Sequence, residues 1–361
     1  MYDEICNLEN LLKAYNLVCK GNRYKESANR YSFFLESNLI KLHQDLVSNN
    51  FIPSPYNHFT IIDPKKRQIA APSFQDRIVQ HALVDKIEAI FDKTFITDAY
   101  ACRKDKGTHF ALRRLKKFLQ ASRTFCGQDK DIYVLKCDIR KYFSSISWEV
   151  LLTIIRRKIS CSKTYDLIDK IITTHQIYGV KSPVLNDQLF LFSPSTDVDE
   201  PVSVVKRKGL PIGNLTSQLF ANVYLNELDK FVKHQLREKW YGRYMDDFLI
   251  ISSDKKHLEE VKEKISQFLT SKLKLTLHPR KSFIHNVKDG VCFVGYRVFW
   301  DHILVRGNTL LRMQKKYRKK ISNFKKGKIP LEKLIQVENS IKGHLKHANA
   351  YDLNKRLFGD E

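Results

Sequence analysis

Two adjacent carboxylates, Asp246 and Asp247, lie inside one of the most apolar runs of the chain, "YGRYMDDFLIISS". Neighbouring acids repel each other, and burying them without a cation costs several kcal/mol. Such a pair therefore lies either in a solvated turn, which aspartate favours, or at a metal ion. Asp138 ends another apolar run, "KDIYVLKCDI". If the two runs are neighbouring strands, the three acids would form an oxygen cage suited to two Mg²⁺ ions, with Mn²⁺ as a substitute. Such ions activate a 3′-hydroxyl and stabilise a leaving pyrophosphate.

The elements that must position these acids follow from the pattern around them. The run "YMDD" is expected to form a hairpin, and "KDIYVLKCDI" a buried strand ending at Asp138. Ser147 is expected to cap the helix "WEVLLTIIRRKI", with Glu149 in its first turn. The turn "GLPIG" precedes a predicted helix, "SQLFANVYLNELDKFVKHQL", and its glycines let the backbone pass close to a base pair or nucleotide.

The rest of the chain divides by pattern. The first sixty residues predict helices, including "LENLLKAYNLVCK" and "YSFFLESNLIKLHQDLVSN". The run "FIPSPYNHFTIIDPKKRQIAAPS" predicts strands and turns, and residues 178–208 predict a long exposed loop or insertion that matches no known motif. Residues 306–333 hold eleven basic residues and one acid on a helical pattern, which predicts a basic helical appendage.

Composition limits the class of protein. The 361 residues are 43% hydrophobic, enough for a core, and 63 Lys and Arg against 39 Asp and Glu give a net charge of +24. This excess favours a polyanionic partner over a surface tuned only for solubility. No apolar run approaches a membrane span, and the acidic, helical start differs from a signal peptide, so a cytoplasmic protein without membrane contact is expected.

The cysteines and histidines give weaker signals. Seven scattered cysteines without a C-x-x-C pair favour reduced, packed thiols over disulfides or a zinc site. His344 and His347 have the spacing of metal ligands, but no cysteine or second histidine pair is near them in sequence. A helix face touching solvent or RNA is therefore favoured over a zinc site.

The order and spacing of four motifs resemble the reverse transcriptases over residues 64–300. Phe143 follows Asp138 by five positions in "DIRKYFSSI", Tyr244 and Met245 precede the acids, and "GLPIGNLTSQ" lies between. The resemblance implies an α+β right-hand polymerase fold with fingers, a palm of antiparallel sheet plus helices, and a short helical thumb. The implied domains are an N-terminal helical extension (1–60), fingers (61–130), the first part of the palm (131–170), a fingers or insertion loop (171–208), the second part of the palm with the primer grip (209–300), and a basic helical thumb (301–361).

The resemblance also implies roles for individual residues. Asp138, Asp246 and Asp247 would be the catalytic, metal-binding triad. Phe143 would exclude a ribose 2′-hydroxyl, Lys281 would protonate pyrophosphate, and "FVGYRV" would be the primer grip. The implied nucleotide-binding residues are Lys65, Arg67, Ile139, Phe143, Ile212, Gly213 and Lys281. The implied nucleic-acid-binding residues are Arg103, Lys104, Arg243, Tyr296, Arg312, Lys315, Lys316 and Lys319.

Within that superfamily the chain is most similar to the enzymes of diversity-generating retroelements, through "YACRKDKGTHFAL" and "LPIGNLTSQLFANVYL". Group II intron enzymes usually carry Pro-Gln-Gly where this chain has Ile212, and Ser-Pro where it has Ser217 and Gln218. An isoleucine cannot hydrogen-bond, which fits error-prone synthesis. The resemblance implies that dNTPs are polymerised on a template-repeat RNA, with errors at adenines, for mutagenic retrohoming in a bacterial or phage-infected cell.

The implied partners are the template RNA, the RNA/cDNA duplex and a small basic accessory variability protein that forms an oligomer. The alternatives are a retron, phage-defence or group II intron-like reverse transcriptase. An RNA-binding scaffold on an inactive polymerase fold is a further alternative, which the three intact acids disfavour.

Overall fold

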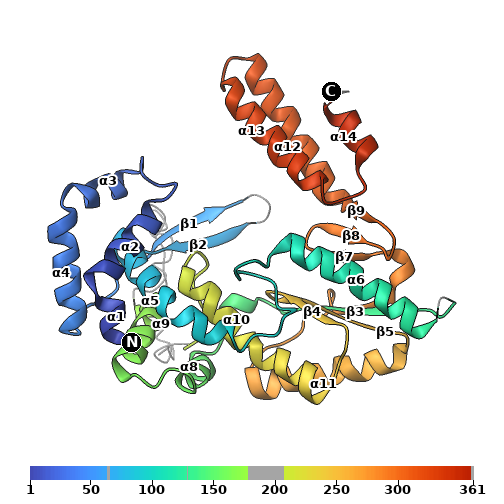
Figure 1. Ribbon diagram of the computed structural model, residues 1–361, viewed down its shortest axis with the longest axis horizontal. Coiled ribbons are helices and arrows are strands. Elements are labelled where there is room, and N and C mark those ends of the chain that lie inside the picture. The colour runs from blue at the N-terminus through green and yellow to red at the C-terminus, as the bar shows by residue number, and fades with distance from the viewer. Residues whose placement is uncertain (63–65, 128, 178–206, 359–361) are drawn as a thin grey trace, which may run out of the picture. The chain divides into compact units, whose positions relative to one another are not determined.

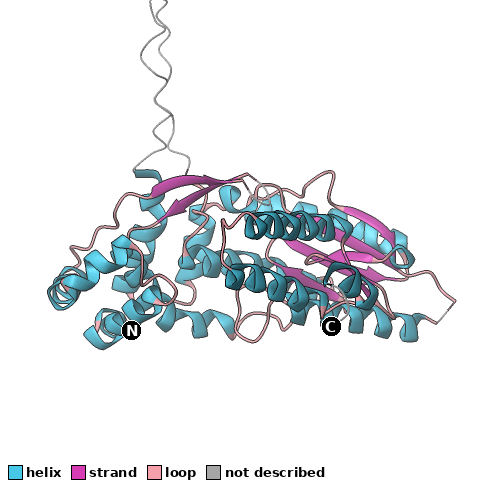
Figure 2. Cartoon of the chain, turned by 90° about the horizontal axis from the view of Figure 1, so that it is seen from above, coloured by secondary structure: helices cyan, strands magenta, loops and turns pink. Residues whose placement is uncertain are grey.

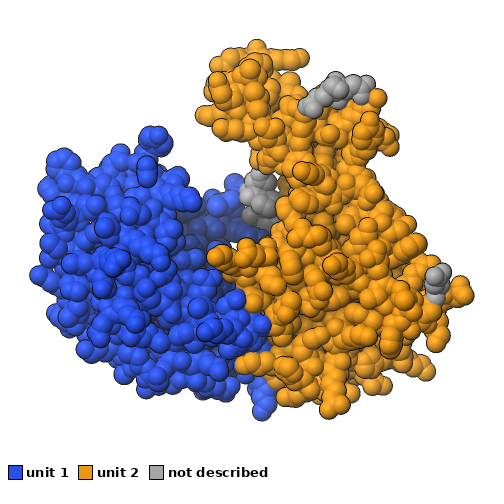
Figure 3. Space-filling view, in the orientation of Figure 1, with its two compact units in different colours: residues 1–95, 141–227, 270–275 blue, residues 96–140, 228–269, 276–361 orange. Residues whose placement is uncertain are grey.

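The computed structural model describes residues 1–62, 66–127, 129–177 and 207–358. The chain forms two compact units (Figure 3). Unit 1 comprises residues 1–95, 141–227 and 270–275, and unit 2 comprises residues 96–140, 228–269 and 276–361. Most of the predicted insertion, residues 178–206, lies outside the described residues, as does Lys65.

In its described residues, unit 1 is mainly helical and contains the hairpin β1–β2 (Figure 1). Its elements are α1 (Tyr2–Cys6), α2 (Leu8–Cys19), α3 (Glu26–Phe33), α4 (Leu35–Val47), β1 (Asn57–Ile61), β2 (Arg67–Ala71), α5 (Phe74–Asp92), α7 (Tyr142–Ser145), α8 (Trp148–Arg156), α9 (Ser162–Ile177) and most of α10 (Leu215–Lys230).

The N-terminal helices form where the apolar spacing predicts them. Leu39, Leu42 and Leu46 on α4 are buried at spacings of three and four, as expected for one helix face. The expected helix from Tyr31 onward is interrupted, because Phe34 has φ −117° and ψ 42° and separates α3 from α4. Periodicity alone does not reveal this interruption, since the apolar positions continue across it.

Helix α8 and the strands after residue 51 are present where the sequence predicts them. Ser147 does precede α8 and Glu149 lies in its first turn, but the Ser147 side chain accepts no capping hydrogen bond. The predicted strands after residue 51 form the antiparallel hairpin β1–β2, in which Asn57 is opposite Ala71 (Figure 2). Both faces of β1 are exposed along its whole length.

Unit 2 contains two antiparallel sheets and the basic helices. Its elements are α6 (Thr108–Cys126), β3 (Tyr133–Asp138), a π-helix (Phe231–Gln235), β4 (Tyr241–Tyr244), β5 (Asp247–Ser252), α11 (Lys255–Leu273, of which residues 255–269 belong here), β6 (Phe283–Asn286), a 3₁₀ turn (Val287–Asp289), β7 (Val291–Phe293), β8 (Tyr296–Val298), β9 (Ile303–Val305), α12 (Gly307–Lys325), α13 (Leu331–Leu345) and α14 (Tyr351–Phe358).

The larger sheet has the order β4-β5-β3-β6 and the smaller one β7-β8-β9. One apolar cluster joins them: it includes Leu115 of α6, Val134 of β3, Leu249 of β5, and Val291 and Phe293 of β7. The predicted strand ending at Asp138 is confirmed as β3, in the interior of the larger sheet. Asp138 at the end of this strand pairs with β5, whereas the pairing with β6 ends at Lys136.

The basic appendage is helical, as predicted. Helices α12 and α13 lie side by side (Figure 1), and the Tyr317 hydroxyl on α12 donates to Glu338 Oε2 on α13 at 3.0 Å. Within the described residues, no helix is both long and apolar enough to cross a membrane. All seven cysteines belong to the described part of the chain and are free thiols.

Candidate active site

The register of the larger sheet places Asp138 directly opposite Asp247. Side chains of directly opposite residues in an antiparallel pair point to the same face, with Cβ atoms about 4.5–5.5 Å apart. Asp246 precedes Asp247 in the turn between β4 and β5, and its carbonyl accepts a hydrogen bond from the Ile139 amide at 3.2 Å. The structure thus brings the three acids to one end of the β3–β5 pair.

The turn that carries Asp246 is tight and strained. Tyr244 pairs with Asp247, so only Met245 and Asp246 connect the strands. Met245 has φ 57°, a left-handed conformation that costs a residue with a side chain about 1–2 kcal/mol. Two-residue hairpin turns need positive φ at their first position, which glycine usually supplies. The surrounding contacts must therefore hold Met245 in place.

Arg243 of β4 provides that support. Its Nη1 donates to the Met245 carbonyl at 3.1 Å, while Nε and Nη2 form a bidentate pair with Asp229 of α10 at 2.7 and 2.6 Å. The side chains of both Arg243 and Asp229 are fully buried. The Tyr241 hydroxyl also donates to Asp229, at 2.6 Å. This buried network fixes the strand leading into the acidic turn.

Two lysines neutralise the acids. Lys281 Nζ lies 3.1 Å from both carboxylate oxygens of Asp138, and Lys136 Nζ lies 3.2 Å from Asp247 Oδ2. Lys281 reaches Asp138 because the sheet bulges beside it. Between the pairs Lys136–Phe283 and Ile139–Leu277 lie only two residues on the β3 side but the five residues 278–282 on the other. The extra residues form a loop that carries the lysine to the acid.

Asp247 is electrostatically unusual. Burial raises its pKa to about 6, and the charges of Asp138 and Asp246 act in the same direction, whereas Lys136 opposes them. Its Oδ1 is buried and has no hydrogen-bond partner. A buried acceptor without a donor is costly, and a cation would relieve it.

These residues fit a divalent metal, although they do not form a complete cage. No group of three His, Cys, Asp or Glu side chains in the described ranges is arranged to hold a metal ion. The available donors at this end of the sheet are carboxylate oxygens, which Mg²⁺ and Mn²⁺ prefer, and the unpartnered Asp247 Oδ1 is among them. Asp138, Asp246 and Asp247 are the residues that would hold the ion.

A second set of predicted residues lies together in unit 1. The Ile212 carbonyl accepts from the Ala70 amide of β2 at 3.0 Å, and the Phe143 carbonyl accepts from the Leu210 amide at 2.8 Å. Gly213 has φ 126°, and a Cβ there would lie 3.1 Å from the Ala70 carbonyl oxygen. The "GLPIG" turn therefore links the segment containing Phe143 to β2, the strand that begins at the exposed Arg67.

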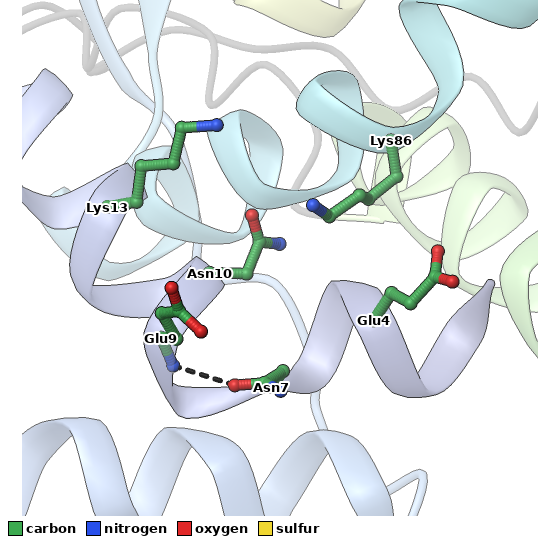
Figure 4. Close-up of a pocket in the computed structure, with 6 residues that line it drawn as sticks. All are labelled: Glu4, Asn7, Glu9, Asn10, Lys13 and Lys86. Atoms are coloured by element: carbon green, nitrogen blue, oxygen red, sulfur yellow. Dashed lines mark hydrogen bonds between the residues drawn. The ribbon is translucent and has the colours of Figure 1, made fainter.

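A pocket in the N-terminal helices involves none of these residues. It is lined by Glu4, Asn7, Glu9, Asn10, Lys13 and Lys86 (Figure 4). The Asn7 side chain accepts from the Glu9 amide at 2.8 Å and caps α2. Lys13 and Lys86 both pair with Asp85, at 2.7 and 3.1 Å. These lining groups are engaged in holding the helices, so the pocket is not part of the candidate site.

Comparison with known proteins decides the family. The family described as "Reverse transcriptase (RNA-dependent DNA polymerase)" matches residues 62–298, more than half of the chain. The chain belongs to the reverse transcriptase family. This reverse transcriptase is 28% identical over 291 residues to protein YkfC of Escherichia coli, covering 71% of the present chain and 70% of YkfC.

Two further relatives bear on its type and fold. It is 24% identical over 368 residues to the group II intron-encoded protein LtrA of Lactococcus lactis, covering 84% of the present chain and 56% of LtrA. The chain thus spans little more than half of LtrA. Among solved structures, apo telomerase from Candida tropicalis matches with a TM-score of 0.51 at 11% identity, over 89% of this chain and 65% of telomerase. At that identity the match supports the fold alone.

Three predicted contacts of the reverse transcriptase need correction. Arg243 cannot touch nucleic acid through its side chain, because it is fully buried against Asp229. Tyr296 is also fully buried, with its hydroxyl at 3.1 Å from His344 Nδ1. The Ile139 side chain is 1% exposed, so it packs in the core and cannot contact a nucleotide. In each case burial excludes a ligand contact made through the side chain.

The other predicted nucleic-acid contacts differ in exposure. Arg103 is half-buried and its Nη1 donates to the carbonyls of Ile96 and Ala99 at 2.7 and 2.9 Å, a structural role. Lys104 is exposed. The predicted residues of α12 are all exposed: Arg312, Lys315, Lys316 and Lys319.

Sequence reasoning missed two residues, Lys136 and Asp229. Lys136 stands two positions before Asp138, and alternation along a strand puts both on one face, so the signal was present. Asp229 lies in the last turn of α10, in the part of that helix that belongs to unit 2, and pairs with a residue 14 positions later. No spacing rule connects those two positions, because the contact depends on how this end of α10 packs against β4.

Proposed function

We propose that unit 2 carries the polymerase centre of this reverse transcriptase and that Asp138, Asp246 and Asp247 are its catalytic acids. The observation that carries the proposal is the direct opposition of Asp138 and Asp247, with the buried Asp247 Oδ1 lacking any donor. A buried carboxylate oxygen without a donor is costly, and a bound cation at this atom would account for it.

The chemistry proposed is addition of dNTPs to a primer on an RNA template. Bound Mg²⁺ would supply a Lewis acid that favours the ionised 3′-hydroxyl and offsets charge on the phosphates. Asp138 and Asp247 would hold that ion from opposite strands. Lys281, whose ammonium already lies at Asp138, is placed to move onto the leaving pyrophosphate and give it a proton.

In this proposal the elements take the roles expected of a right-hand polymerase. The four-stranded sheet of unit 2 would be the palm, the β1–β2 hairpin part of the fingers, and α12 to α14 the thumb. Arg67 would pair with the triphosphate, and Phe143 would exclude a ribose 2′-hydroxyl. The exposed cations of α12 support duplex backbone binding, since phosphate contacts are made mainly by such side chains.

The test is primer extension on a defined RNA by Asp138→Asn and Asp246→Asn. Each change removes the negative charge of one carboxylate. The activation free energy of extension should therefore rise by several kcal/mol, and the extension rate should fall about 10³-fold or more. RNA affinity and circular dichroism should match the parent, and Asp254→Asn, an acid outside the site, serves as the matched control. Extension at the parental rate by a folded Asp246→Asn protein would refute the proposal.

A narrower role is proposed from the residues around Ile212. We propose that the enzyme copies a template-repeat RNA with errors at adenines, as in diversity-generating retroelements, together with a small basic accessory protein. Its support is the isoleucine where group II intron enzymes have glutamine, positioned at the turn that contacts β2. The similarity to LtrA is equally consistent with a group II intron-like enzyme without that role.

The Ile212→Gln variant separates these two functions. A glutamine can hydrogen-bond the template base or nucleotide, so misincorporation opposite adenine should fall more than opposite the other bases, about tenfold for one added hydrogen bond. Sequencing of cDNA made on one template by the parent, Ile212→Gln and the apolar control Ile212→Leu measures it. An unchanged adenine error rate with full activity would remove Ile212 from the fidelity mechanism.

A further inference from the structure

Lys136 lies on β3, an inner strand of the larger sheet, and pairs with Asp247. It is on β3, on the same face as Asp138, and its side chain is 15% exposed. Its ammonium makes two contacts: Asp247 Oδ2 at 3.2 Å, and the carbonyl oxygen of Cys292 at 2.6 Å. A lysine so enclosed is rare unless paired, because burial of the ammonium is costly.

The two contacts connect two sheets. Asp247 begins β5 in the larger sheet, whereas Cys292 is the middle residue of β7 in the smaller one. Through Lys136, the carboxylate is therefore tied to the β7 backbone. Lys281 differs, because it sits on the loop 278–282 with its side chain 48% exposed and can leave Asp138 more easily.

The consequence concerns the two oxygens of Asp247. Oδ2 is held by Lys136, while Oδ1 is buried without a partner. A carboxylate fixed at one oxygen cannot rotate freely, so its other oxygen keeps a defined direction. Groups outside the ligand set orient metal ligands in this way, and their loss typically weakens metal binding about 10- to 100-fold.

Resting on the proposed function, we propose that Lys136 is a positioning residue: it holds Asp247 Oδ2 against the Cys292 carbonyl so that Oδ1 points to the divalent metal. Lys136 itself touches neither metal nor nucleotide. It acts before the metal arrives, by fixing the carboxylate that receives it.

Metal binding without substrate tests this directly. Mn²⁺ is titrated into the full-length protein and the free ion is followed by electron paramagnetic resonance. Lys136→Met should raise the Mn²⁺ Kd about 10- to 100-fold, and Lys136→Arg, which keeps the charge and donors, should raise it less. Lys255→Met, the same change at an exposed position on α11, should leave the Kd unchanged.

The direction of the change discriminates between two roles. Removing a positive charge by itself tightens the binding of a cation, so a lower or equal Kd in folded Lys136→Met means that Lys136 is only a counter-ion, and the proposal is overturned. The Asp138→Asn protein tests the site itself. If Asp138→Asn has the same Mn²⁺ Kd as the parent, the metal site and the proposed function are refuted. If Asp138→Asn raises the Kd and Lys136→Met leaves it unchanged, only the inference about Lys136 is refuted.

A double-mutant cycle covers the case in which Lys136→Met folds but is too unstable for the metal titration. Unfolding midpoints are measured in chelator for Lys136→Met, Asp247→Asn and the double variant. If Lys136 acts through Asp247, its replacement should lower the midpoint much less when Asp247 is already asparagine. An equal loss in both backgrounds, or a double variant that fails to fold, would show a packing role through Cys292 and overturn the proposal.

Discussion

At the scale of single residues, the proposed site places three acids close together although their negative charges repel each other. Asp247 faces Asp138 and follows Asp246, and Lys136 offsets its charge. The pKa of Asp247 is raised to about 6, so the folded protein holds a proton on this carboxyl more tightly than the unfolded chain does. Without metal, the ionised carboxylate therefore destabilises the fold.

The corresponding prediction is that Asp247→Asn stabilises the metal-free protein at neutral pH. The folded pKa of about 6 lies above the ordinary value of 3.8, so the parental free energy of unfolding should fall as pH rises from about 4 to 6. A shift of about two units corresponds to an upper limit of about 3 kcal/mol, and loss of the Lys136 ion pair reduces the expected gain to about 1–2 kcal/mol at pH 7. Urea unfolding in chelator at several pH values measures it.

The control is the pH dependence itself. Near pH 3 the parent and Asp247→Asn should have similar stability, because the parental carboxyl is then mostly protonated in both the folded and the unfolded state. A stability difference that stays constant between pH 3 and 7 would mean that the asparagine acts by packing and not by removing a strained charge.

Sequence reasoning located the acids but not all of their surroundings. Asp138, Asp246 and Asp247 were visible because charges inside apolar runs violate the ordinary pattern. Arg243 was misjudged for a related reason: a basic residue beside an acidic turn resembles a ligand-binding residue, and only the three-dimensional position of Asp229 shows that Arg243 is buried. Pairings between distant segments leave no local periodicity.

At the scale of elements, the β4–β5 hairpin depends on contacts that β4 makes close to the turn. Arg243 joins α10 to the strained Met245 turn, and Gly242 allows the close approach of Tyr100, whose hydroxyl would lie 2.8 Å from an added Cβ. The hairpin and β3 were predictable from alternation and turn residues. The five-residue loop beside Asp138 was not, because an extra length on one strand appears only when the register with its neighbour is known.

The element-scale prediction separates stability from positioning. Arg243→Met leaves Asp229 buried without its partner, which should cost about 3–5 kcal/mol in unfolding free energy. Adding Asp229→Asn removes the second charge and keeps an acceptor for Tyr241, so most of that stability should return. Primer extension should not return, because the Met245 carbonyl still lacks its donor. Denaturant unfolding and primer-extension rates are compared for Arg243→Met, for Arg243→Met with Asp229→Asn, and for Asp229→Asn alone. If the double variant recovers activity together with stability, the Arg243 network has no role in positioning the turn.

At the scale of the whole molecule, the excess of positive charge must be assigned to surfaces. A net charge of +24 attracts any polyanion, but only cations that contact phosphates release counterions locally. On α12, Lys315 and Lys316 follow Arg312 by three and four positions and precede Lys319 by four and three, and all four residues are exposed. They therefore form one basic stripe on the helix.

The final prediction is that this stripe contacts the nucleic-acid backbone. Changing the four residues to glutamine should weaken binding of an RNA/DNA duplex and reduce the slope of log K against log salt by up to about 3, since each phosphate that is no longer neutralised accounts for about 0.7–0.9. Lys255, Lys256, Lys264 and Lys272 of α11 are also exposed, and their fourfold glutamine variant changes the net charge equally. That control should lower affinity slightly through the general field and keep the slope. Equal slopes of log K against log salt for the two variants would mean that α12 contributes only its charge. A flatter slope for the α12 variant alone, on duplexes of unrelated sequence, would assign the stripe to contacts with the phosphate backbone that do not depend on the base sequence.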